Sequence, residues 1–198
     1  MDDIVKQALA KWPNVPHCYG WLALDARGNW RMRDERAQHF NLPGDKLNNA
    51  ALVAFITRNY AADERGCWYF QNGPQRVYVQ LEATPYIVRT DPAAGWRLHT
   101  GAPLGAPEEV LLTETGALVL RGGEVVAQLD DRDFADVLPR LQLNGATVAD
   151  DVLLEWIEGK AQGALSLDDV PVQRIAADQL AARFGYVSVP TSPVAADR

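Results

Sequence analysis

The most constraining feature of this chain is an order of elements that occurs twice. In the first half, a β-hairpin turns at Gly28, helical periodicity covers 47–60, and a strand with the sequence VQLEATP follows. In the second half, a hairpin turns at Gly116, a helix is expected at 131–142, and a strand with the sequence LSLDDVP follows. A repeat of this length predicts a duplicated domain, because solenoid repeats span only about 20–50 residues.

Both late strands end in the same short pattern, in which an acid and two further residues precede Pro85 or Pro171. The offset between these prolines nearly equals the offset between the turn glycines. Hairpins and helices are common, so each match alone could be a coincidence. Order, spacing and strand ending together favour duplication.

These elements predict an α+β fold with two tandem repeats, each an antiparallel β-sheet packed against a helix. Residues 1–92 are expected to form an N-terminal helix and the first hairpin–helix–hairpin unit. Residues 93–190 form a second, related unit, and residues 191–198 form a tail.

Four local predictions accompany this fold. We expect a polar connection without regular structure at 35–46, a single strand through 163–172, and a final strand at 186–189. Thr147 followed three residues later by an acid predicts a capping box at the start of a helix.

Composition narrows the class of protein. A formal charge of −7 argues against general binding to nucleic acid or to an anionic membrane, because both need a basic surface. No apolar stretch approaches the roughly 18 residues of a membrane span. Cys18 and Cys67 provide neither a disulfide framework nor a zinc motif. We therefore expect a cytoplasmic protein with reduced thiols, no bound metal and no cofactor.

An ordered set of motifs in residues 20–90 resembles a bacterial family of domains of unknown function. The family pattern runs Gly-x-Trp, Leu-Val-x-Leu-Phe, Gly-x-Tyr, Thr-Pro-x-x-Lys-Val and Glu-Asp-x-Pro-Phe. The matching segments here are Gly28-x-Trp30, Leu52-Val53-x-Phe55, Gly66-x-x-Tyr69, Pro74-x-Arg76-Val77 and Glu82-x-x-Pro85-Tyr86.

This resemblance implies a duplicated α+β fold and a suggested role in ligand binding or signal transduction. The chain departs from the pattern in a longer connection at 35–46, a shorter loop after Pro74, and Ala83 where the family prefers Asp. The resemblance therefore indicates a related, equally uncharacterised proteobacterial group.

The strand at 76–82 carries the candidate site. Alternation places three apolar side chains on one face and Arg76, Tyr78, Gln80 and Glu82 on the other. Arg76, Tyr78 and Glu82 together could hold a small anionic ligand, because a guanidinium pairs in a fork with a carboxylate or phosphate. The alternative is a solvated polar face with weak cross-strand pairs.

No familiar catalytic or metal-binding pattern is present in the sequence. The three histidines lie in different connections, and none belongs to an HExxH motif or to a readable triad. The acids of 130–133 lack the spacing of a calcium loop and suit the start of a helix.

We therefore expect a non-catalytic module that binds either a small ligand, such as an anion, or a partner protein, in a role accessory to signalling. The alternative is an enzyme with its active site in a cleft between the two units. Sequence alone names neither the ligand nor the oligomeric state.

Overall fold

The computed structural model describes residues 1–193 and divides them into two compact units. Unit 1 holds residues 1–85 together with the described residues from Gly185 onward, and unit 2 holds Tyr86–Phe184. The division expected at 92/93 lies instead before strand β7 (Tyr86–Asp91), because β7 pairs with strands of unit 2. Most of the expected tail, 194–198, lies outside the described residues.

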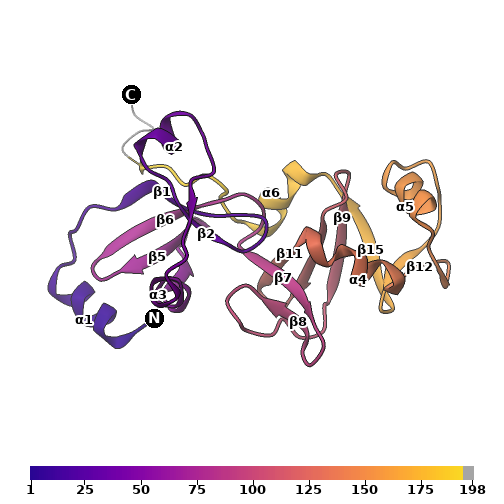
Figure 1. Ribbon diagram of the computed structural model, residues 1–198, viewed down its shortest axis with the longest axis horizontal. Coiled ribbons are helices and arrows are strands. Elements are labelled where there is room, and N and C mark those ends of the chain that lie inside the picture. The colour runs from indigo at the N-terminus through magenta and orange to yellow at the C-terminus, as the bar shows by residue number, and fades with distance from the viewer. Residues whose placement is uncertain (194–198) are drawn as a thin grey trace. The chain divides into compact units, whose positions relative to one another are not determined.

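Unit 1 is built on a six-stranded sheet with the order β3-β2-β1-β6-β5-β4 (Figure 1). The central pair β1–β6 is parallel and the other pairs are antiparallel. The strands are β1 (Cys18–Leu24), β2 (Trp30–Met32), β3 (Asp45–Lys46), β4 (Tyr60–Ala62), β5 (Trp68–Asn72) and β6 (Gln75–Leu81).

Three helices accompany this sheet, α1 (Asp3–Lys11), α2 (Glu35–His39) and α3 (Ala50–Arg58). The side chain of Asn49 caps α3 by accepting a hydrogen bond from the backbone N–H of Leu52 at 3.0 Å. Helix α3 buries Ile56 and sets the ring of Phe55 edge-on against Phe70 of β5, with centroids 5.4 Å apart. The helix therefore covers the apolar face of the sheet.

Alternation along β6 separates an apolar face from a polar one. Val79 and Leu81 are buried, and they pair in register with Leu22 and Leu24 of β1. The neighbours that point to the other face include Tyr78, which lies opposite Tyr69 of β5. The face without α3 therefore carries the aromatic and polar side chains.

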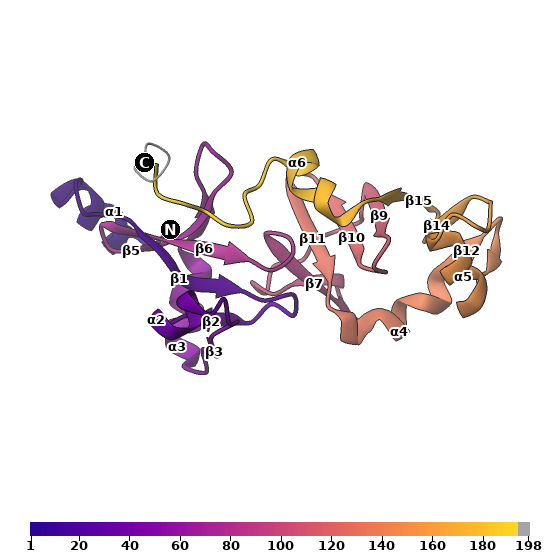
Figure 2. The ribbon, with the colours of Figure 1, turned by 90° about the horizontal axis from the view of Figure 1, so that it is seen from above.

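Unit 2 is built on a nine-stranded sheet with the order β13-β12-β14-β15-β9-β10-β11-β7-β8 (Figure 2). Pairs β9–β15 and β7–β11 are parallel. Its further strands are β8 (Gly95–Leu98), β9 (Glu109–Thr113), β10 (Leu118–Gly122), β11 (Val125–Leu129), β12 (Leu141–Leu143), β13 (Ala146–Thr147), β14 (Leu165–Leu167) and β15 (Val170–Ile175).

The helices of unit 2 are short: α4 (Phe134–Val137), α5 (Asp150–Ile157) and α6 (Leu180–Phe184), with 3-10 turns beside α4 and α6. Helix α5 contributes Leu153 and Trp156 to a continuous core that reaches from β8 to β15. The indole N–H of Trp156 donates to the carbonyl of Gly163 at 3.1 Å, so its one polar group is satisfied inside the core.

Six strands of unit 2, β11-β10-β9-β15-β14-β12, follow the pairing order of the unit 1 sheet, and in both the central pair is parallel. The prolines that suggested the repeat are not equivalent, however. Pro85 lies in the connection between β6 and β7, whereas Pro171 lies inside β15. The prediction that the two acid–x–x–Pro segments occupy equivalent positions in the two units was therefore wrong.

Two local predictions at the connections are corrected. Residues 35–46 contain α2 and β3, because the Asp34 side chain caps the helix by accepting from the N–H of Ala37 at 2.7 Å. The segment 163–172 is a hairpin, because Asp168 and Asp169 both adopt positive φ, 48° and 68°, in the turn. This backbone is uncommon for residues other than glycine, although Asp and Asn adopt it more readily than most.

Two predictions at chain ends are also corrected. Thr147 does not cap α5; the residue at the cap is Ala149, whose side chain makes no capping bond. In place of a strand at 186–189, Val187 forms an isolated parallel bridge with Cys67.

The α+β class is confirmed, with two sheets and their helices.

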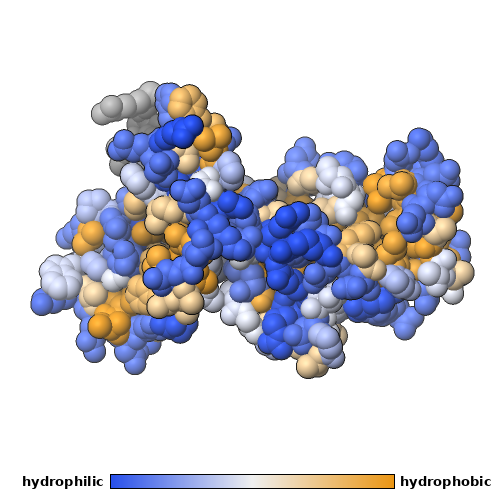
Figure 3. Space-filling view, viewed as in Figure 1, coloured by the Kyte–Doolittle hydropathy of each residue, from blue (hydrophilic) through white to orange (hydrophobic). Residues whose placement is uncertain are grey.

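Helices α3 and α5 expose two apolar side chains, Leu52 and Leu154, and hydrophobic colour gathers over both helices on the face in Figure 3. Among the helices of residues 1–193, none has the length and apolar character needed to cross a membrane.

Candidate functional site

A cavity of about 480 Å³ opens on the polar face of the unit 1 sheet. We call it the Arg–Tyr pocket. Its lining residues come from β1 and the residue before it, from β4 and the turn after it, from β5 and β6, and from the C-terminal segment: His17, Tyr19, Ala62, Asp63, Glu64, Arg65, Tyr69, Arg76, Tyr78 and Pro193.

The floor of the pocket is aromatic. Tyr19 and Tyr78 stack with their rings 4.5 Å apart and nearly parallel, and His17 meets Tyr78 edge-on at 5.8 Å. Tyr69 also contacts Tyr78 edge-on at 5.8 Å. Val187 from the C-terminal segment packs against this cluster. The floor is therefore fixed by packing from several parts of unit 1.

Asp63 organises the turn that forms one wall. Its Oδ1 accepts from the backbone N–H groups of Arg65 and Cys67, both at 2.9 Å, and its Oδ2 accepts from the Tyr78 hydroxyl at 2.9 Å. Arg65 also pairs with Oδ2 at 3.2 Å, and only 8% of the Asp63 side chain is exposed. Burial alone would raise the pKa of Asp63, but these hydrogen bonds outweigh it and hold the pKa below its ordinary value.

Arg76 supplies the available positive charge. Its guanidinium carbon lies 4.5 Å from the centre of the Tyr69 ring, and the side chain is partly buried. Within residues 1–193 no carboxylate lies at ion-pair distance from Arg76, whereas Arg65 is already paired with Asp63. Stacking holds the guanidinium in place beside the Tyr78 hydroxyl, and its remaining N–H groups are available to a ligand.

Two further groups complete the polar lining. The Tyr19 hydroxyl is buried and makes no hydrogen bond of good geometry with the described residues, although it lies near enough to Arg65 to raise the pKa of that guanidinium. Burial, followed by the charges of Arg76 and Arg65, lowers the pKa of His17, so its imidazole is neutral at pH 7. A buried hydroxyl without a partner is costly unless a ligand or water satisfies it.

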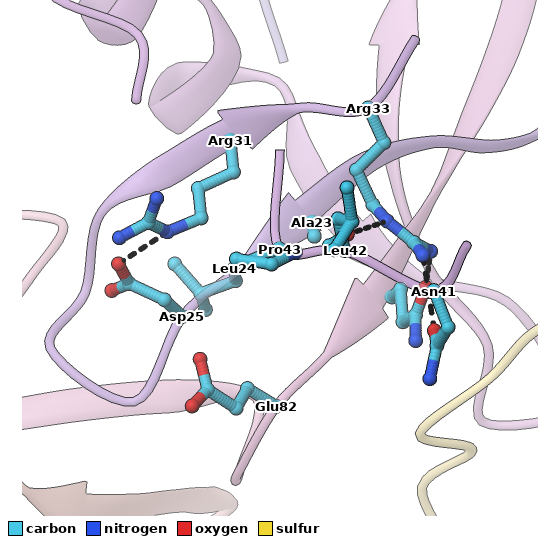
Figure 4. A pocket seen from close by; sticks show the side chains of 10 residues that line it. Ala23, Leu24, Asp25, Arg31, Arg33, Asn41, Leu42, Pro43 and Glu82 are labelled. Carbon is cyan, nitrogen blue, oxygen red and sulfur yellow. Dashed lines mark hydrogen bonds and ion pairs between the residues drawn. The ribbon is translucent and has the colours of Figure 1, made fainter. Parts of the chain in front are cut away.

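The predicted residues are divided between two places. Arg76 and Tyr78 lie together in the Arg–Tyr pocket, whereas Glu82 lines a separate cavity of about 360 Å³ at the other end of β6. Figure 4 shows this second cavity, which we call the Asp–Arg pocket, with Glu82 facing Asp25. Alternation put all three residues on one face, but the length of the strand separates Glu82 from the others.

The other residues that line the Arg–Tyr pocket were not predicted from sequence, and His17, Tyr19, Asp63 and Arg65 are the most important of them. They reach the pocket through the parallel pairing of β1 with β6 and through the turn after β4. The only local signal was the sequence Asp63-Glu64-Arg65-Gly66, which is typical of a turn that an Asp side chain organises.

The acidic run 130–133 has a structural role in unit 2. The Asp130 carboxylate is fully buried and pairs with Arg89 at 2.6 Å and Arg132 at 2.5 Å, and Asp133 accepts from the N–H of Thr90 at 2.9 Å. In the part of the chain that the structure describes, no three His, Cys, Asp or Glu side chains gather as metal ligands would. Cys18 and Cys67 are free thiols.

Two solved structures are similar to this chain at low sequence identity. A DUF1285 family protein from Silicibacter pomeroyi DSS-3 has 15% identity and a TM-score of 0.49, covering 91% of this chain and 98% of that one. A DUF1285 family protein from Shewanella baltica OS155 has 15% identity and a TM-score of 0.34, covering 59% and 88%. Likeness at this level says nothing of what this chain binds.

No curated protein matches the chain. Residues 1–191 match the family DUF2944, described as "Protein of unknown function (DUF2946)". The match covers nearly the whole chain, so the expectation of an uncharacterised family of domains of unknown function is confirmed. The chain belongs to this family of proteins of unknown function.

Proposed function

We propose that the protein is a non-catalytic module that binds a small anion in the Arg–Tyr pocket. The observation that supports this most directly is Arg76, a partly buried guanidinium that stacks on Tyr69 and has no carboxylate partner among the described residues. A guanidinium in this setting donates to a carboxylate or a phosphate oxygen.

The surrounding groups favour an anion over a cation. The carboxylate of Asp63 is saturated by hydrogen bonds and by Arg65, so it offers little to a positively charged ligand. The Tyr19 hydroxyl makes no hydrogen bond of good geometry with the described residues and can donate to a ligand, and neutral His17 supplies another donor. Glu64 is the one unfavourable neighbour, but it is exposed on the turn and therefore well solvated.

Titration calorimetry with inorganic phosphate and with citrate tests the proposal. Arg76→Met should weaken binding about tenfold or more, since a charge-assisted hydrogen bond contributes about 1.5–3 kcal/mol. Glu64→Gln should strengthen binding, because it removes a like charge from the rim. Arg36→Gln, an exposed change on α2, is the matched control and should leave affinity unaltered.

Two results would contradict the proposal. One is saturable anion binding that is unchanged in Arg76→Met. The other is the absence of binding in the wild-type protein with either anion. The alternative, an enzyme acting in a cleft between the units, stays a prediction.

We also propose that the two units arose by duplication, with β3-β2-β1-β6-β5-β4 equivalent to β11-β10-β9-β15-β14-β12. The shared order with a parallel central pair supports this. Aligning the two halves across many family sequences tests it: matching residue patterns are expected at equivalent strand positions, and their absence would count against duplication. A cytoplasmic location, supported by two free thiols, is likewise a proposal that cell fractionation tests.

A further inference from the structure

The Asp–Arg pocket of unit 1 contains a buried cation that no acid compensates. Arg33 is only 6% exposed. Its guanidinium donates to the carbonyls of Leu42 (3.0 Å) and Ala37 (3.3 Å) and to the side-chain oxygens of Asn41 (3.1 Å) and Gln80. All four partners are neutral, so the positive charge stays uncompensated within the described residues.

The same contacts leave two amide donors in the lining at this end of the pocket. Asn41 and Gln80 accept from Arg33 through their oxygens, which leaves both amide N–H₂ groups to donate elsewhere. One N–H of Arg33 is also left over. This end of the pocket therefore combines a positive charge with several donors, the combination that a carboxylate needs.

The other end of the pocket carries a negative charge. Oε2 of Glu82 accepts from the backbone N–H of Ala26 at 3.1 Å, which holds the carboxylate toward the β1–β2 turn. Glu82 makes no ion pair with the described residues, whereas its neighbour Asp25 is paired with Arg31 at 2.7 Å. Figure 4 shows Glu82 beside Asp25 and Arg33 with Asn41 at the opposite side of the cavity.

Between these ends the lining is mostly apolar, formed by Ala23, Leu24, Leu42 and Pro43. Arg33 and Glu82 do not reach one another across the cavity, so each charge is left for a ligand. We propose that the Asp–Arg pocket binds a small zwitterion, with its carboxylate at Arg33 and its ammonium at Glu82. This site is distinct from the Arg–Tyr pocket and its ligand has no net charge.

Calorimetry with glycine, 4-aminobutyrate and 6-aminohexanoate tests the proposal, and the best length reports the span between the charges. Hexanoate and hexylamine, which each keep one charge, should bind at least tenfold more weakly than the best zwitterion. Glu82→Gln should weaken zwitterion binding about tenfold, whereas Glu124→Gln on the β10–β11 turn and Arg76→Met should not change it. Because Arg33 ties α2 to the sheet, Glu82 is the safer position to vary.

Three outcomes would overturn the proposal: no binding of any zwitterion at millimolar concentration, equal binding of hexanoate, or unaltered affinity in Glu82→Gln. Loss of zwitterion binding in Arg76→Met would place the ligand in the other pocket and would also refute it.

Discussion

Replacing Gly66 with alanine should destabilise unit 1 more than the same change at another turn glycine. Gly66 has a φ of +75°, and a Cβ built there would lie 2.0 Å from the backbone carbonyl oxygen of Gly185. This close approach seats the C-terminal segment, because the N–H of Val187 donates to the carbonyl of Gly66 at 3.0 Å. Gly73, with a φ of +57°, is the control, since its Cβ would meet only Ala8 at 3.9 Å.

Two separate costs determine how much stability each variant should lose. An L-residue with left-handed backbone costs about 1–2 kcal/mol, and both variants share this cost. Gly66→Ala adds overpacking, which costs about 1–3 kcal/mol, and a backbone oxygen cannot rotate away as a side chain can. We expect Gly66→Ala to be about 3 kcal/mol less stable than Gly73→Ala, or roughly 6–12 °C lower in Tm for a chain of this length.

Thermal unfolding followed by far-ultraviolet circular dichroism, with urea titration beside it, measures this difference. Equal Tm values for the two variants would show that the contact between Gly66 and Gly185 does not constrain the fold. Such a result would also mean that this contact does not hold Val187 against the pocket floor.

Three further predictions concern charge and packing. Hydrogen bonds from Arg97 and backbone N–H groups hold the pKa of Asp91 at about 2. The ionised carboxylate therefore adds to the free energy of unfolding above about pH 3.8, and this contribution should be lost as the pH falls toward 2. Carbon-detected NMR titration measures that pKa, and a value near 3.8 would contradict the contact. Trp156→Ala should cost about 3–5 kcal/mol in urea unfolding, whereas Leu154→Ala, on the exposed side of α5, should cost less than about 0.5 kcal/mol; similar losses would refute the packing. Sulfate affinity should rise as the pH falls through the depressed pKa of His17, because imidazolium attracts the anion while sulfate keeps its own charge, and a pH dependence that persists in His17→Gln would refute that role.

The fold was predictable from sequence where a glycine marks the turn between two strands. The hairpins at Gly28 and Gly116 were predictable because glycine there supplies the positive φ that the turn needs. The turn at Asp168–Asp169 was missed because the same backbone is formed by residues that rarely adopt it. Helix α2 is a single short turn, so hydrophobic periodicity could not reveal it.

The candidate site was predictable only along one strand. Alternation identified Arg76 and Tyr78 because their relation needs no knowledge of the neighbouring strands. Tyr19 and Asp63 arrive through pairings between distant segments, which periodicity does not specify. The same limit explains why Glu82 was grouped with Arg76 and Tyr78, since nothing in the local pattern indicates that one face of the sheet holds two separate pockets.

The most direct test of the anion-binding account is NMR observation of the arginine Nε–H groups during titration with inorganic phosphate. The account predicts a saturable shift of the Arg76 resonance, with little change at Arg36 on the exposed face of α2. A titration in which Arg76 does not move while phosphate binds elsewhere, or in which Arg36 shifts equally, would contradict it.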